Sequence, residues 1–213
     1  TAHKQLGDTF WLGVSIYVPS ATHLDKDITF VQVHPNMHAT PPLSFKNDVG
    51  RFKLLLRMAS GLRAFDAGAI VKDRWYDVVV NMKITTGSSG FARLWLNGTL
   101  VGSHVGATVA ADSVSPTHSA FLKCGMYMPV WRDIDPDDDR ILYVDEIRLG
   151  KADSSFAEVN PAQGGGSGPQ PCTGNILANG EFNSNTNWSS SSNGVRAITG
   201  GAFHISGTAA HLP

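Results

Sequence analysis

The stretch Ile28-Thr29-Phe30-Val31-Gln32-Val33-His34 decides the fold, because its side chains alternate between apolar and polar over most of its length. A period of two is typical of a β-strand with one face on a core. The same period recurs in residues 51–58, 77–84 and 141–149. Since no segment has a convincing helical period, the pattern predicts an all-β protein.

Turn signals separate these runs and fix the strand direction. They are Pro41-Pro42, Asn47-Asp48, residues 86–90 and Asn97-Gly98. Asn-Gly between two strand-like runs predicts a hairpin, because both residues tolerate positive φ. We therefore predict an antiparallel β-jelly roll, a concanavalin A-like sandwich with one flat or concave sheet.

The composition excludes several classes of protein. The chain has 213 residues and a formal charge of -1, from 17 basic and 18 acidic side chains. This balance argues against a nucleic-acid partner. No apolar run approaches the roughly 20 residues that span a bilayer, so we expect no membrane partner either. Two cysteines are too few for a disulfide scaffold.

Composition also divides the chain into three parts. Residues 1–161 are expected to form one domain, and residues 162–171 form a Gly-rich and then Pro-rich linker. Residues 172–213 are rich in Ser, Asn and Gly and too short to bury a core of their own. We expect them to be the incomplete start of a second module.

Alternation also sorts the side chains by face. Val31 and Val33 point to the core, so Gln32 and His34 point away from it. In the other runs the same face collects Arg51, Lys53, Arg57, Arg93, Trp95, Lys123, Gly125 and Tyr127. Cys124 falls on the core stripe and is expected to be a buried, inert thiol. The ordinary interpretation of each residue alone is solvated surface, cross-strand packing or, for Gly125, a bulge.

Several motifs resemble the heparin-lyase-like polysaccharide lyases, which include glucuronan lyases (family 20) and heparin lyase I (family 13). The resemblance runs in order from Phe10 to Pro161 and includes "WLGVSIYVP", "FVQVHP", "PPLSF", "FLKCGMY" and "YVDEIRLGK". It implies a jelly roll that cleaves a polymer containing uronic acid, most closely glucuronan, by β-elimination. The products would carry 4,5-unsaturated uronate ends.

The resemblance also implies the catalytic residues, because Gln32, His34, Lys123 and Tyr127 match the family's positions. Gln32, with Lys123 or Arg57, would neutralise the uronate carboxylate beside the C5 proton. Tyr127 would remove that proton and protonate the leaving O4 when the two lie on one side of the ring. His34 would orient the carboxylate or Tyr127, or act as the base on the opposite epimer.

The remaining basic and aromatic residues of this face are assigned to substrate binding. They are Arg51, Lys53, Arg57, Arg93, Trp95 and Gly125, the last because a sugar ring can lie against a strand at a glycine. The family has further strand sequence, often with an Arg and a Glu, before the "WLGVSIY" segment. Here nine residues precede Phe10, so we expect an open sheet edge.

Three other interpretations address parts of the same sequence. A non-catalytic, lectin-like glycan-binding module would use Trp95 and the basic side chains, and it is the alternative function. A glycosidase is disfavoured because Asp145 and Glu146 are adjacent and face opposite sides of a strand. The acidic run that holds Asp135, Asp137 and Asp139 could hold a structural Ca²⁺, although a solvated loop is favoured.

The tail has a resemblance of its own. "CTGNILANGEFNSNTNW" is similar to the opening of carbohydrate-binding jelly-roll modules that follow linkers in secreted polysaccharide-degrading enzymes. We therefore expect an extracellular, secreted monomer that acts on an anionic polysaccharide and needs no organic cofactor.

Overall fold

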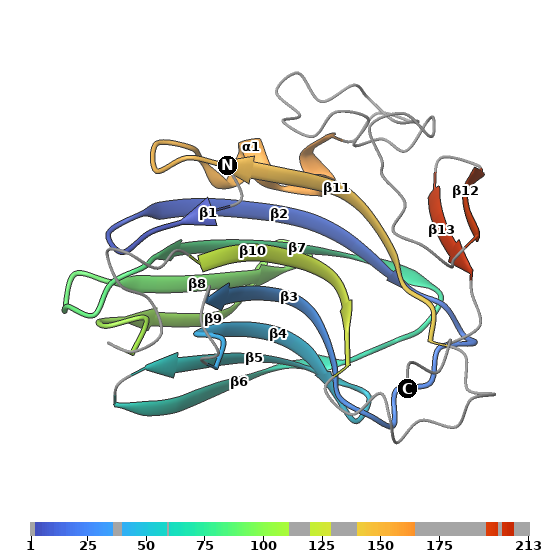
Figure 1. The fold of residues 1–213 in the computed structure, drawn as a ribbon, viewed down its shortest axis with the longest axis horizontal. Coiled ribbons are helices and arrows are strands. Elements are labelled where there is room, and N and C mark those ends of the chain that lie inside the picture. The colour runs from blue at the N-terminus through green and yellow to red at the C-terminus, as the bar shows by residue number, and fades with distance from the viewer. Residues whose placement is uncertain are drawn as a thin grey trace, which may run out of the picture.

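The computed structural model describes residues 3–35, 40–58, 60–110, 120–128, 140–164, 195–199 and 202–206. Two antiparallel sheets form a sandwich, which confirms the predicted all-β, jelly-roll-like fold (Figure 1). Sheet A has six strands in the order β1-β10-β3-β4-β5-β6, and sheet B has five strands in the order β11-β2-β7-β8-β9.

The strands of sheet A are β1 (His3–Lys4), β10 (Ala120–Tyr127), β3 (Ile28–Pro35), β4 (Leu43–Asp48), β5 (Arg51–Met58) and β6 (Gly61–Ala69). The strands of sheet B are β11 (Tyr143–Gly150), β2 (Thr9–Val18), β7 (Arg74–Lys83), β8 (Phe91–Leu96) and β9 (Thr99–Val105). A separate hairpin pairs β12 (Val195–Thr199) with β13 (Ala202–Ser206). No described helix is long and apolar enough to cross a membrane.

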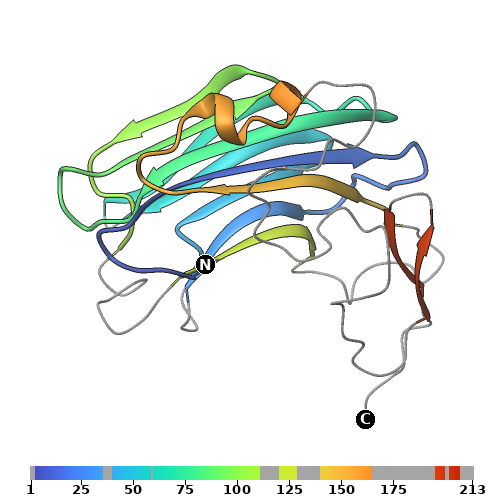
Figure 2. The ribbon, with the colours of Figure 1, turned by 90° about the horizontal axis from the view of Figure 1, so that it is seen from above.

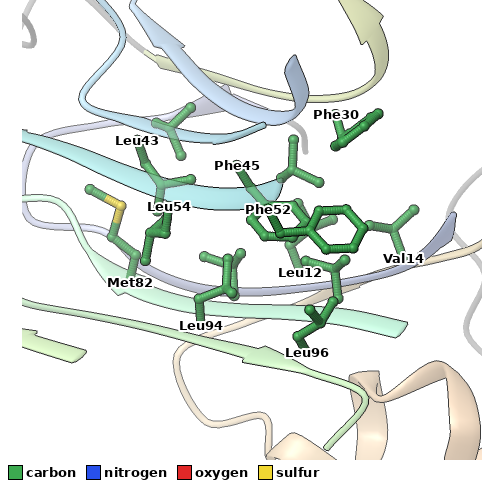
Figure 3. Packing of buried hydrophobic residues seen from close by; sticks show 14 of the residues in the cluster. Leu12, Val14, Phe30, Leu43, Phe45, Phe52, Leu54, Met82, Leu94 and Leu96 are labelled. Carbon is green, nitrogen blue, oxygen red and sulfur yellow. The ribbon is translucent and has the colours of Figure 1, made fainter. Parts of the chain in front are cut away.

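The core lies between the two sheets and follows the alternation of the sequence. Phe45 and Phe52 of sheet A stack with ring centroids 5.1 Å apart, and both are fully buried. Figure 3 shows Leu54 and Leu43 on one side of this layer and Met82 and Leu94 on the other. Apolar side chains therefore fill the inward face of each sheet. The polar side chains of the same strands lie on the outer faces.

The turn residues adopt the backbone conformations that hairpins require. Asn97 and Gly98 have φ values of 49° and 78°, which confirms the hairpin between β8 and β9. The turn after β4 lies at Val49-Gly50, two residues beyond the predicted Asn47-Asp48. Asn47 is a buried strand residue whose side-chain oxygen accepts the backbone N–H of Gly50 at 2.8 Å. It therefore stabilises the turn from the end of the strand.

A short helix, α1 (Phe156–Val159), and a 3-10 helix, η2 (Pro161–Gly164), cover part of the outer face of sheet B (Figure 2). Neither was predicted from the sequence, because four residues are too few to show a helical period. Ser155 caps α1, and its hydroxyl accepts the backbone N–H of Glu158. Gly13 of β2 lets the helix approach, since a Cβ there would lie 1.7 Å from the carbonyl oxygen of Val159.

β1 lies at the edge where the sequence predicted an open strand. It pairs only with Ala120 and Phe121 of β10. No described strand pairs with the same edge of β10 at residues 122–127.

Candidate active site

A pocket of about 380 Å³ lies on the outer face of sheet A, between β3 and β10. The outer-face residues that line it are Thr29, Gln32, His34, Lys123, Gly125 and Tyr127. Its volume is in the range of sites that bind small ligands. The structure therefore brings the four predicted catalytic residues, Gln32, His34, Lys123 and Tyr127, to one pocket.

Strand register sets the order of these side chains along the pocket. Gln32 is paired with Lys123 across β3 and β10, and Tyr127 is paired with Thr29. His34 lies two residues beyond Gln32, which is roughly 7 Å along the strand. Gln32 and Lys123 therefore lie in the middle of the pocket. His34 lies on one side of this pair, and Tyr127 lies on the other.

A β-bulge in β3 decides which way Gln32 and His34 point. The register with β4 shifts between Thr29 and Val31, and Phe30 and Val31 are both buried in the core. Strict alternation from Phe30 would turn Gln32 inward. The bulge inserts one residue and so places Gln32 and His34 on the outer face.

A second bulge shapes β10 beside the pocket. The register with β3 shifts between Cys124 and Tyr127, and Gly125 has a φ of 133°. A Cβ at Gly125 would meet nothing within 4 Å, so space alone does not require a glycine there. The backbone conformation does, because side chains rarely adopt this φ. Figure 1 shows β3, β4 and β10 curving together at this level of sheet A.

Gln32 is the most enclosed polar side chain of the pocket. It is 6% exposed, and its amide makes no hydrogen bond within the described part of the chain. Its amide atoms are not among the enclosed polar atoms that lack a partner, so they open onto the pocket, where a ligand or water can satisfy them. Gln32 is therefore oriented to bind a polar group in the pocket.

A backbone contact fixes the tautomer of His34. Its Nδ1 lies 2.7 Å from the carbonyl oxygen of Pro35. A carbonyl only accepts, so Nδ1 carries the proton and donates it. In the neutral ring Nε2 then has no proton, and it can accept a proton or a hydrogen bond from a ligand.

Lys123 and Tyr127 are the exposed members of the site. Tyr127 is 56% exposed. Neither side chain has an ion pair or a hydrogen bond to the residues that the structure describes. Both are therefore available to a ligand, one as a cation and one as a hydroxyl.

Cys124 lies in the wall of the same pocket, with its side chain packed on the core. It is a free cysteine, and burial raises the pKa of its thiol from 9.0 to about 11. The thiol is therefore protonated at neutral pH and is a poor nucleophile. This agrees with the predicted inert thiol.

The three cations of β5 share the outer face of sheet A but lie outside the pocket. β5 is two strands from β3, or about 10 Å. Arg51 pairs with Asp66 at 2.5 Å, and Lys53 pairs with Asp48. Arg57 is exposed and has no ion pair to any residue in the described ranges.

The prediction that Arg93 and Trp95 share this face is wrong. Both belong to β8, and the hairpin places that strand in sheet B, so their side chains point away from sheet A. Trp95 stacks on Trp11 at 5.7 Å and contacts Phe156 of α1 at 5.4 Å. Alternation gives the face of a strand but not the sheet to which the strand belongs, which is why the sequence misplaced these two residues.

The structure adds residues that were not predicted from the sequence. Ser44 of β4 is paired with Gln32, and Lys46 is paired with Thr29. The alternation of residues 43–48 was the signal that could have identified them. Thr29 was hidden by the bulge, which breaks the period of two.

The described residues contain no group of three His, Cys, Asp or Glu side chains that could hold a metal ion. Asp135, Asp137 and Asp139, the predicted calcium candidates, lie outside the described residues.

Comparison with known proteins identifies the family. A family model described as "Polysaccharide lyase" matches residues 1–148. This chain belongs to the polysaccharide lyase family. It is therefore an enzyme with a polysaccharide as its substrate, as the sequence motifs predicted. No curated protein matches the chain by sequence.

Solved structures with the same fold include polysaccharide lyases. The endo-β-1,4-glucuronan lyase of the fungus Trichoderma reesei matches with a TM-score of 0.60 and 17% identity, over 76% of this chain and 75% of that one. A family 7 alginate lyase, A1-II′ in complex with product, matches with a TM-score of 0.50 and 14% identity, over 70% of this chain and 65% of that one. At these identities the likeness supports the jelly-roll-like fold.

Proposed function

We propose that this polysaccharide lyase cleaves a glucuronan-like polymer by β-elimination and leaves 4,5-unsaturated uronate ends. The observation that carries the proposal is the Gln32–Lys123 pair at the centre of the pocket, between His34 and Tyr127. An amide donor and an ammonium side by side suit a carboxylate. The two flanking groups can each exchange a proton.

The difficult step is removal of the proton from C5 of the uronate. The neighbouring carboxylate opposes further negative charge, so that charge must be neutralised as the carbanion forms. Lys123 and the amide of Gln32 do this by donating hydrogen bonds to the carboxylate, which stabilises the enolate-like intermediate. This contribution grows as charge moves onto the carboxylate oxygens in the transition state.

Tyr127 performs the two proton transfers. In its deprotonated form it takes the C5 proton. The C5 electron pair forms the C4=C5 double bond, the C4–O4 bond breaks, and the new phenol gives its proton to O4. In glucuronate the C5 proton and O4 lie on one side of the ring, so one residue reaches both. Tyr127 ends as phenolate, and no redox or group-transfer cofactor is required.

His34 orients the sugar in this scheme. Its Nδ1 is occupied by the carbonyl oxygen of Pro35, so neutral His34 offers an acceptor at Nε2. It accepts a hydrogen bond from a sugar hydroxyl on the side of the ring opposite Tyr127. On a polymer of the opposite C5 epimer, the same nitrogen could take the proton instead.

Glucuronan is proposed over other polyuronates for two reasons. The solved structure with a TM-score of 0.60 is named as a glucuronan lyase. The placement of a single phenol in the pocket also suits removal and return of a proton on one side of a ring, which favours glucuronate or mannuronate over guluronate, the C5 epimer. A polymer substrate lies outside the cell, which is the reason to propose that the enzyme is secreted.

The test is an assay of the full chain on polyglucuronate, polymannuronate and polyguluronate, monitored by the ultraviolet absorbance of the C4=C5 double bond. We expect absorbance to rise fastest with polyglucuronate. A faster rise with either alginate block would overturn the substrate assignment but keep the elimination. Retention of polymer without any rise would overturn catalysis and leave a glycan-binding module.

A further inference from the structure

The outer face of sheet A carries more cations than the reaction uses. The described strands place Lys46, Arg51, Lys53, Arg57 and Lys123 on it. Three carboxylates lie among them: Asp27 pairs with Lys46, Asp48 pairs with Lys53, and Asp66 pairs with Arg51. The charge left for a ligand is therefore concentrated on Lys123 and Arg57.

These three ion pairs lie on the path of a bound polymer. Register places Tyr127, Thr29, Lys46, Lys53 and Asp66 in one row across β10, β3, β4, β5 and β6. Neighbouring strands are about 4.8 Å apart, so Lys53 is roughly 14 Å from Tyr127. An oligosaccharide that starts at the pocket and crosses the strands reaches these pairs within a few sugars.

Two of these carboxylates, Asp48 and Asp66, remain charged at neutral and mildly acidic pH. The hydrogen bond from Lys53 holds the pKa of Asp48 below its usual value. The hydrogen bonds from Arg51 and from the backbone N–H of Gly68 do the same for Asp66. A lowered pKa keeps the carboxylate ionised from neutral pH down to below its ordinary value of 3.8. Asp48 and Asp66 are therefore ionised, and able to pair with Lys53 and Arg51, throughout the neutral and mildly acidic range.

We propose that Asp27, Asp48 and Asp66 are specificity determinants that select a sparsely charged polyuronate and reject a sulfated one. By neutralising Lys46, Lys53 and Arg51, they remove the cations that would bind sulfates along the polymer. Each carboxylate also repels a sulfate brought next to it, so discrimination includes a repulsive element. The inference rests on the proposed function, because it concerns the polymer that enters the same pocket.

The experiment compares polyglucuronate with the same polymer after chemical sulfation. The test variant is the double substitution D48N/D66N, which frees Lys53 and Arg51. The D66N change keeps a side-chain oxygen that can accept the backbone N–H of Gly68, so the strand is not deprived of that bond. The matched control is Asp153→Asn, an exposed aspartate after β11 whose loss changes the net charge without touching sheet A.

We expect D48N/D66N to bind sulfated polyglucuronate roughly threefold to tenfold more tightly than the native protein at low salt. We expect a smaller gain for the unsulfated polymer, and therefore a shift in the ratio of the two affinities. Asp153→Asn should leave that ratio where it is in the native protein. Adding Lys53→Gln to the double variant should remove part of the gain.

An unchanged ratio in D48N/D66N, or an equal shift in Asp153→Asn, would overturn the inference. Circular dichroism melting curves establish that each variant is folded, and Asp48→Asn alone replaces the double variant if that one unfolds. Absence of cleavage of polyglucuronate by the native chain would instead overturn the proposed function. The binding ratio is measured without cleavage, so the two failures are distinguishable.

Discussion

Tyr127 is the residue on which the proposed chemistry depends most. Its hydroxyl faces the pocket and makes no bond to the described residues, so removing it leaves the fold intact. We expect Tyr127→Phe to lower kcat by about 10²- to 10⁴-fold, the range for loss of a general acid–base group. Affinity for polyglucuronate should change little, because in the proposed mechanism Gln32 and Lys123 hold the carboxylate.

The control for that variant is Tyr17→Phe, which removes the same hydroxyl from the outer face of sheet B. Its kcat should equal that of the native enzyme. Initial rates of double-bond absorbance and equilibrium binding of a uronate oligosaccharide provide the two readouts. Near-native kcat in Tyr127→Phe would remove Tyr127 from the mechanism.

A second prediction at the scale of single residues concerns the reactivity of the Cys124 thiol. Burial raises the pKa of its thiol to about 11 from 9.0, so the neutral form is favoured in the folded protein. Near neutral pH the thiolate fraction is about 100-fold smaller than in the unfolded chain, since each pKa unit is a factor of ten, and the ratio falls to about 50-fold at pH 9.0.

The thiolate fraction of Cys124 can be measured by the rate of its alkylation with iodoacetamide, followed by peptide mass spectrometry. Cys124 should react about 100-fold more slowly in the folded protein than in denaturant at mildly alkaline pH. The rate in the folded protein should keep rising with pH until about 11. Equal rates in the two states would show that the thiol is not buried.

At the scale of single strands, the two bulges decide which way the site side chains point, more than the amino-acid types of the strands do. Gly125 allows the bulge of β10 with its φ of 133°. An alanine there is strained by about 1–3 kcal/mol. We expect Gly125→Ala to lower the melting temperature and to reduce kcat more than it raises KM, because Tyr127 lies two residues beyond and moves with the strand.

The matched control is Gly87→Ala. Gly87 is exposed between β7 and β8, and a Cβ there would have an ordinary 3.5 Å contact with Thr85. It should change neither the melting temperature nor kcat beyond error. Thermal denaturation and steady-state kinetics of both variants test the role of the β10 bulge. A Gly125→Ala variant as stable and as active as the native protein would contradict that role.

The strands themselves were largely predictable from the period of two. The prediction of 51–58 as a strand is confirmed at both ends, and the Asn97-Gly98 hairpin has the expected positive φ values. β6 escaped prediction because it is an edge strand with mostly exposed residues, so its sequence lacks a buried stripe. Strand faces could be predicted, but the division of strands between sheets could not, and this explains the error for Arg93 and Trp95.

The prediction for Gln32 and His34 relied on Val31 and Val33 and not on Phe30. Had the alternation been counted from Phe30, both polar residues would have been assigned to the core. A bulge leaves no clear mark in a single sequence, because both inserted residues can be apolar. The face of the sheet that carries Gln32 and His34 could therefore be predicted only from the residues that follow the bulge.

At the scale of the whole molecule, attraction of the polymer is local. The net charge is -1, so the chain as a whole does not attract an anionic polymer. Binding should rely on Lys123 and Arg57, the two cations on the outer face of sheet A that lack ion pairs within the described residues. We expect KM for polyglucuronate to rise with salt, with a logarithmic slope of about one to two, and kcat to stay constant.

Steady-state kinetics over a series of salt concentrations measures that slope. In the proposed mechanism Lys123 also takes part in the chemistry. Arg57→Gln is therefore the informative variant, and it should lower the slope by about one. A slope of about five, one for each cation of the face, would mean that the ion pairs open for the polymer. The same result would also argue against the specificity inference.

Beyond the lyase domain, the predicted linker at 162–171 and the module start at 172–213 stay predictions. The structure describes residues 161–164 and the β12–β13 hairpin there. The hairpin forms its own two-stranded sheet and adds no strand to sheet A or sheet B. The two large sheets and the site are built from residues that precede this part of the chain.

The central claim is that the pocket breaks the glycosidic linkage by elimination. The most direct measurement is mass spectrometry of the products released from polyglucuronate in water enriched in oxygen-18. Elimination predicts that each cleavage yields one fragment lighter than the hydrolysis product by one water, and that no heavy oxygen enters at the break before the new reducing end exchanges its oxygen with the solvent. Fragments of full mass that carry oxygen-18 at the new reducing end would show hydrolysis, and they would contradict the account.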